Sequence, residues 1–132
     1  MTPLEKLMAE YDDRLKFVFR KDMPGPLKGL IVGNTIYIND NLDFRERLSI
    51  IAEEIGHHET LADGTDISDY SDMKLENRGR NWGRKKLVPI EELKAFIKNR
   101  ESVEGYEIAE EFGVTDDYIK EVVSMYRVKG EL

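Results

Sequence analysis

Cysteine is absent from this sequence of 132 residues, and histidine occurs only twice. The absence of cysteine excludes a disulfide framework, a thiolate metal site and a cysteine nucleophile, and it fits a reducing cytosol. No apolar run approaches the roughly 18 residues that a membrane-spanning helix needs, and the N-terminus lacks the apolar segment of a signal peptide. We therefore expect a cytoplasmic protein that has no membrane partner.

Basic residues are too few to balance the acidic ones: 20 stand against 27, which gives a formal net charge of −7. This balance disfavours a protein whose whole surface binds nucleic acid. Residues 106–126 have the spacing of a helix-turn-helix, but its second helix carries Asp116, Asp117 and Glu121, where a DNA-reading helix presents basic or amide side chains. Because phosphates repel these carboxylates, we expect no direct contact with nucleic acid. The favoured alternative is a helical pair that packs on the rest of the chain through Ile108, Phe112, Ile119, Val122 and Val123.

The spacing of apolar residues predicts an α+β fold. An amphipathic helix near the N-terminus runs into an extended segment, and two β-branched runs around Gly33 and Asn34 predict a hairpin near residues 30–38. A polar, acidic loop is expected at residues 61–72, and Pro89 separates two later helices.

The strongest predicted helix starts near Asp43, with Asn41 or Asp43 as its N-cap and Glu46 completing a capping box on Asp43. At about 100° per residue, one stripe of this helix faces the core. The stripe consists of Phe44, Leu48, Ile51, Ala52 and Ile55. Glu53 and His57 lie one turn apart on nearly the opposite side.

The segment IAEEIGHHET contains the last four positions of an H-E-x-x-H motif, but Glu53 stands where the first histidine is expected. If Glu53 and His57 bind a metal, Glu54 follows the first ligand, where such sites keep their general base. If Glu54 and His58 were the ligands, an isoleucine would follow and no base would exist, so chemistry favours the first register. The plainer alternative is a solvated i,i+4 pair of Glu53 and His57, with His58 partly buried and bonded to backbone.

A second helix offers a third ligand, because Glu76, Gly79 and Gly83 fall on one stripe of its surface. Glycine inside a helix costs about 1 kcal/mol relative to alanine, so this stripe predicts that another backbone comes close to it. Arg80 and Arg84 flank the stripe, either as contacts to a substrate or as surface charges.

The segment EEIGHH followed by ENRGRNWGRKKLVP at residues 76–89 resembles the ImmA/IrrE family of metallopeptidases. That family pairs an H-E-x-x-H helix with a later E-x-x-A-x-x-F-A-x-x-L-L-x-P helix that supplies the third ligand, and a similar hairpin precedes them. The resemblance covers residues 11–90 and is closest to the phage and integrative-element type, in which Glu-Glu-x-Gly-His is a variant of the motif. It implies a zincin-like small antiparallel sheet packed with the two ligand helices in residues 1–99, and a C-terminal helical appendage in residues 100–132.

The resemblance also implies roles. His57 and Glu76 would be metal ligands with Glu53 in place of the usual histidine, and Glu54 would be the base that activates water for attack on a peptide carbonyl. The substrate would be a helix-turn-helix repressor of a phage or mobile element. The metal would be a divalent ion, Zn²⁺ first and Mn²⁺ or Fe²⁺ as alternatives. Because two carboxylates and one imidazole make an oxygen-rich site, we expect weak or exchangeable binding, with reduced selectivity for zinc.

A non-catalytic module that binds a repressor or host protein on the same scaffold is the alternative function. Convergence of Glu53, His57 and Glu76 on one point would favour the enzyme. Exposure of Glu76, or its pairing with an arginine, would favour the binding module. The hairpin is open to two interpretations as well: an edge that accepts substrate as an added strand, or simply part of the sheet that covers the core.

Overall fold

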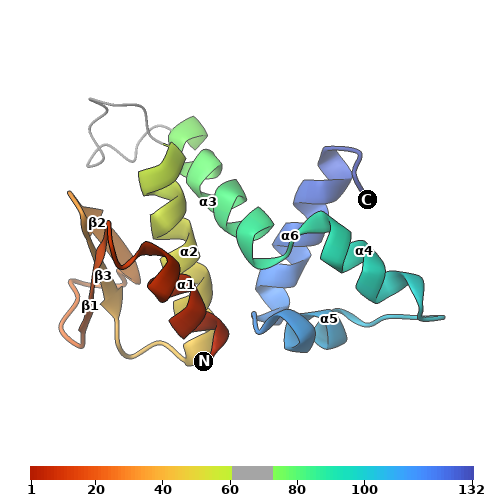
Figure 1. Cartoon of the computed structure of the whole chain (residues 1–132), viewed down its shortest axis with the longest axis horizontal. Helices are drawn as coiled ribbons and strands as arrows, with labels where there is room; N and C mark the ends of the chain where they lie inside the picture. The colour runs from red at the N-terminus through yellow and green to blue at the C-terminus, as the bar shows by residue number, and fades with distance from the viewer. Residues whose placement is uncertain (61–72) are drawn as a thin grey trace.

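The computed structural model describes residues 1–60 and 73–132, so the acidic loop expected at residues 61–72 lies outside the described part of the chain. The fold is α+β, as predicted. In chain order the elements are α1 (Pro3–Tyr11), β1 (Lys16–Arg20), β2 (Gly29–Val32), β3 (Thr35–Asn39), α2 (Phe44–Thr60), α3 (Met73–Leu87), α4 (Ile90–Lys98), α5 (Gly105–Phe112) and α6 (Asp116–Val128). Figure 1 shows the sheet with α1, α2 and α3 on one side of the molecule and α4, α5 and α6 on the other. Among the described residues, no helix has the length and apolar character to cross a membrane.

The three strands of the described sheet are arranged in the order β1-β3-β2. Strands β2 and β3 pair antiparallel through the turn at Gly33, which has a φ of 59°, so the predicted hairpin is confirmed. Strand β1 pairs with β3 in parallel, which makes the sheet mixed rather than wholly antiparallel as expected. The reason is the strand order: β3 is the central strand, and it runs beside β1 in the same direction. Strand β2 is left at an edge of the sheet.

Helix α2 packs on the sheet through the predicted stripe. Leu48, Ile51, Ala52 and Ile55 are at most 1% exposed. Phe44 was expected in this stripe but is 54% exposed, because it is the first residue of the helix and the buried stripe begins one turn later. The side chain of Asp43 accepts a hydrogen bond from the backbone N–H of Glu46 (3.0 Å), so the predicted N-cap is present.

The C-terminal helices α5 and α6 contribute apolar side chains to the core. Thr115 caps α6 by accepting a hydrogen bond from the backbone N–H of Tyr118 (3.1 Å), a role that suits a threonine directly before a helix. The buried hydroxyl of Tyr126 donates to the carbonyl of Val88 at 2.7 Å, which ties α6 to the segment that joins α3 and α4. The five apolar residues predicted to pack are all buried or partly buried: Ile108, Phe112, Ile119, Val122 and Val123. The division of the chain into residues 1–99 and 100–132 stays a prediction.

Candidate metal centre

Helices α2 and α3 meet at their glycines. A methyl group on Gly56 would overlap the carbonyl oxygen of Gly79, and one on Gly83 would lie 3.1 Å from the carbonyl carbon of Ala52. The close backbone approach that the glycine stripe predicted is therefore confirmed. As a result α2 is covered on two sides, by the sheet on its apolar stripe and by α3 on the face that carries His57.

One cavity of about 720 Å³ lies beside this helix pair, and α2, α3, β2 and α6 all contribute to its walls. Every residue that the sequence nominated for the site lines it: Glu53, Glu54, His57, Glu76, Arg80 and Arg84. His58 does not line it. Strand β2 reaches the cavity at Gly29, where a methyl group would lie 2.5 Å from Cγ2 of Ile50 and 3.4 Å from Cγ of Glu54. The edge strand is therefore held close to the side chain proposed as the base.

Glu54 is the most deeply buried carboxylate of the site, at 7% exposure. Burial raises its pKa to about 8, and the neighbouring charges of Glu53 and Glu76 act in the same direction. Its Oε2 atom is buried and has no hydrogen-bond partner among the described residues. A carboxylate with these properties is able to exchange a proton near neutral pH, which is what a general base requires. Its catalytic role stays a prediction.

His57 is 3% exposed, although the helical wheel placed it away from the core. Its imidazole lies against the backbone of α3, because a methyl group on Gly79 would overlap the ring. Burial lowers the pKa of His57; the carboxylates of Glu53 and Glu76 oppose that effect, and Arg80 reinforces it. The net direction favours the neutral imidazole, which is the form that binds metals.

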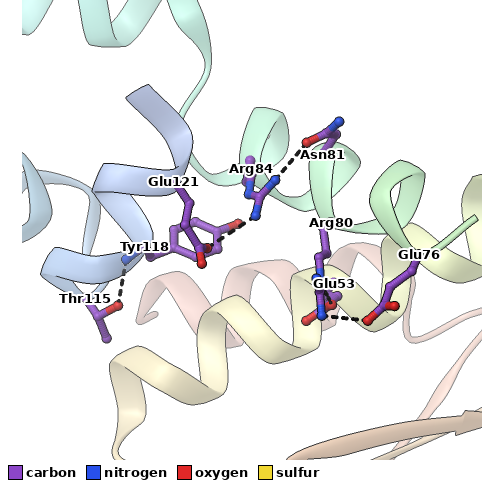
Figure 2. A network of polar contacts seen from close by, with 8 residues as sticks. All are labelled: Glu53, Glu76, Arg80, Asn81, Arg84, Thr115, Tyr118 and Glu121. Atoms are coloured by element: carbon purple, nitrogen blue, oxygen red, sulfur yellow. Dashed lines mark hydrogen bonds and ion pairs between the residues drawn. The ribbon is translucent and has the colours of Figure 1, made fainter. Parts of the chain in front are cut away.

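Arg80 bridges the two helices by pairing with both candidate carboxylate ligands. Its Nε atom lies 2.7 Å from Oε1 of Glu53 on α2, and its Nη2 atom lies 2.6 Å from Oε1 of Glu76 on α3. Figure 2 shows the guanidinium of Arg80 between these two carboxylates. Arg80 was expected either to contact a substrate or to be a surface charge; the structure pairs its donors with Glu53 and Glu76, and a contact with substrate stays a prediction.

Another part of the cavity wall comes from Arg84 of α3 and from α6. Arg84 donates to Oδ1 of Asn81 (2.9 Å) and approaches Oε2 of Glu121 (3.4 Å), and its buried Nε atom has no partner among the described residues. Tyr118 lies beside Arg84 (Figure 2), and burial raises the pKa of its phenol. Sequence reasoning missed Tyr118 and Glu121, because helical periodicity places them on α6 without showing which cavity α6 lines.

The donor set suits a divalent cation in its chemistry. Two carboxylates and a neutral imidazole line one cavity, an unpartnered carboxylate oxygen of Glu54 faces the same region, and a cationic group already lies between Glu53 and Glu76. Within residues 1–60 and 73–132, however, no three acidic or histidine side chains converge closely enough to hold a metal ion. The candidate ligands line one cavity, and the cationic group that lies between the two carboxylates is the guanidinium of Arg80.

Comparison with known proteins identifies the family. The model of the peptidase M78 family, described as the IrrE N-terminal-like domain, matches residues 5–121, a range that includes all of the residues that line the cavity. No curated protein and no solved structure gave a match. The family match supports metallopeptidase activity in general terms and, with it, a divalent metal. This chain therefore belongs to the peptidase M78 family, whose domain resembles the N-terminal part of IrrE.

Proposed function

We propose that this protein is a metal-dependent endopeptidase that cleaves a helix-turn-helix repressor of a phage or mobile element. The observation that carries the proposal is that all six nominated residues line one cavity, within a domain of a peptidase family. When bound by Glu53, His57 and Glu76, a divalent ion would polarise water and the scissile carbonyl. Its identity, Zn²⁺ or alternatively Mn²⁺ or Fe²⁺, is part of the proposal, as is a cytoplasmic location.

The chain's own residues account for the remaining chemistry. Strand β2 has an edge that no strand pairs with in the described sheet, and it borders the cavity at Gly29 and Leu30. An extended substrate segment would add to that edge by main-chain hydrogen bonds and lie across the cavity. Glu54, with its raised pKa and unpartnered oxygen, would take the proton from the attacking water and pass it to the leaving amine. Burial lowers the pKa of His57, which favours the neutral imidazole that binds metals.

A second function has a specific observation in its favour. Glu76 pairs with Arg80, which is the arrangement expected of a non-catalytic module that binds a repressor or host protein without cleaving it. In that case β2 and the cavity would still hold a protein segment, and Arg80 would hold α2 and α3 together.

Co-expression with a candidate helix-turn-helix repressor separates the two functions. We would compare wild type with Glu54→Gln, and with Glu59→Gln as a matched control, because Glu59 lies on the same helix but does not line the cavity. Repressor fragments with wild type and Glu59→Gln but none with Glu54→Gln would support proteolysis. Intact repressor that is co-purified and inactivated equally by all three would reject proteolysis in favour of binding.

A further inference from the structure

The position of Arg80 has a consequence for metal binding. Its guanidinium takes one oxygen from each of two carboxylates on different helices, Glu53 at 2.7 Å and Glu76 at 2.6 Å. These are two of the three side chains that would hold the divalent ion. Arg80 already holds one oxygen of each carboxylate, so a divalent ion bound to the same two carboxylates would lie close to the guanidinium, where the two positive charges repel each other.

We infer that Arg80 is an internal competitor for the metal, so that a divalent cation binds only when the Arg80 side chain leaves the two carboxylates. The inference rests on the proposed metal site, but it concerns occupancy rather than cleavage. It makes Arg80 a determinant of which cations the site accepts: an ion must interact with the two carboxylates and His57 strongly enough to replace two charge-assisted hydrogen bonds. Weak and exchangeable binding then has a structural cause in addition to the oxygen-rich ligand set.

Glu53 is the residue that makes this competition effective. With a histidine at that position, Glu76 would be the only carboxylate of the ligand set, and Arg80 would keep only its i,i+4 ion pair on α3. With glutamate, the same arginine reaches a second carboxylate on α2. One guanidinium then offsets half of the charge of the carboxylate pair, and a divalent ion would offset all of it. Glu53 therefore attracts the divalent ion and the guanidinium of Arg80 alike, and the guanidinium is already part of the protein.

Arg80 is free to leave without unfolding the protein. Its side chain is 44% exposed, whereas those of Glu53 and Glu76 are 22% and 25% exposed, so the arginine covers the pair from the solvent side. Ion pairs as exposed as these are weak, because water and salt compete for both partners. Arg84 differs, since its side chain is 17% exposed and its donors face Asn81 and Glu121. Arg80 is therefore the arginine of the cavity that controls access to the carboxylates.

Metal titration tests the inference on the full chain. We would treat wild type, Arg80→Gln and Arg78→Gln with chelator and titrate each with Zn²⁺ and with Mn²⁺ by calorimetry. Arg78 is the matched control, because it is an exposed arginine on the same helix that does not line the cavity. We expect Arg80→Gln to bind at least about tenfold more tightly than wild type, within the range of ordinary coupling between two binding events, and Arg78→Gln to match wild type. Equal or weaker binding by Arg80→Gln would overturn the inference.

A second variant and a second measurement keep the test valid if Arg80→Gln fails to fold. In Arg80→Met the new side chain is also long and unbranched, and methionine is a good helix former, but it cannot pair with carboxylates. This variant should therefore show the same gain in affinity. In thermal unfolding, excess Mn²⁺ should raise the Tm of both Arg80 variants by more than that of wild type. Equal increases in all three would contradict the competition. Neither measurement requires cleavage, so a gain in affinity with no repressor fragments would reject the proposed peptidase and leave the inference about Arg80 standing.

Discussion

Replacing Gly56 with alanine tests the packing on which the whole site depends. In an isolated helix this change is stabilising by about 1 kcal/mol, because alanine has the higher helix propensity. In this protein the new methyl group would overlap the carbonyl oxygen of Gly79 and lie 3.0 Å from its carbonyl carbon. Backbone atoms cannot rotate away as a side chain does, so α3 must move. Overpacking of this kind costs about 1–3 kcal/mol or more. Because the overlap is with backbone, we expect a cost in the upper part of this range, about 2–3 kcal/mol, which leaves a net loss of about 1–2 kcal/mol in the free energy of unfolding.

Two further substitutions calibrate this expectation. A methyl group on Gly83 would meet the carbonyl carbon of Ala52 at 3.1 Å, a milder contact, so Gly83→Ala should lose less than Gly56→Ala. A methyl group on Gly105 would meet nothing within 4 Å, so Gly105→Ala should be neutral or about 0.4–1 kcal/mol more stable. Urea unfolding of the four proteins, with the slope m compared to confirm two-state behaviour, gives the free energies. If Gly56→Ala is as stable as wild type or more stable, the helices are not in backbone contact at this point.

The remaining predictions concern a titrating group, a buried hydrogen bond and a helix cap. Glu54 has a folded-state pKa of about 8 against 4.5 for the free group, so the folded state binds the extra proton and stability falls as pH rises through that window. From pH 5 to pH 8.5 the free energy of unfolding of the metal-free wild type should fall by about 4 kcal/mol relative to Glu54→Gln, since each unit of pKa difference corresponds to about 1.36 kcal/mol. Parallel pH profiles of the two proteins would contradict the raised pKa. Tyr126→Phe leaves the buried carbonyl of Val88 without its donor and should cost about 1–3 kcal/mol in urea unfolding, and a loss below 0.5 kcal/mol would argue against this bond. Thr115→Ala removes the cap on the N–H of Tyr118 and should cost about 1 kcal/mol, whereas Thr115→Ser should restore most of it.

The local elements of the fold were predictable because their signals are short in range. Asp43 and Thr115 are capping residues placed just before apolar periodic segments, and both caps are present. The turn at Gly33 lies between two β-branched runs and forms the hairpin. The parallel pairing of β1 with β3 was not predictable in the same way. It depends on which side of the hairpin the earlier strand joins, and no residue within β1 or β3 specifies that choice.

The site was predictable to the extent that helical geometry determines it. Glu53 and His57 lie one turn apart on α2, and the glycines of α3 allow that face to be covered at van der Waals distance. These two facts bring Glu76 to the same cavity. The contribution of Tyr118 from α6 was missed, because a position on an amphipathic helix says that a residue is half-buried but not what it faces.

Arg80 and Arg84 show where helical geometry stops being sufficient. Both flank the Glu76 stripe on a helical wheel, and both line the cavity, yet one pairs with the ligand carboxylates and the other with Asn81 and Glu121. The difference comes from the partner helix, because Glu53 lies opposite Arg80 on α2 and Glu121 lies opposite Arg84 on α6. A glutamate in place of the first histidine thus changes two properties at once. It supplies an oxygen ligand for a metal, and it gives the neighbouring arginine a reason to occupy the metal's position. Which cation prevails depends on the difference between the interactions of the guanidinium and of the divalent ion with the same two carboxylates. Such a difference is set by distances and exposure in the folded protein, and it is what the Arg80 variants measure.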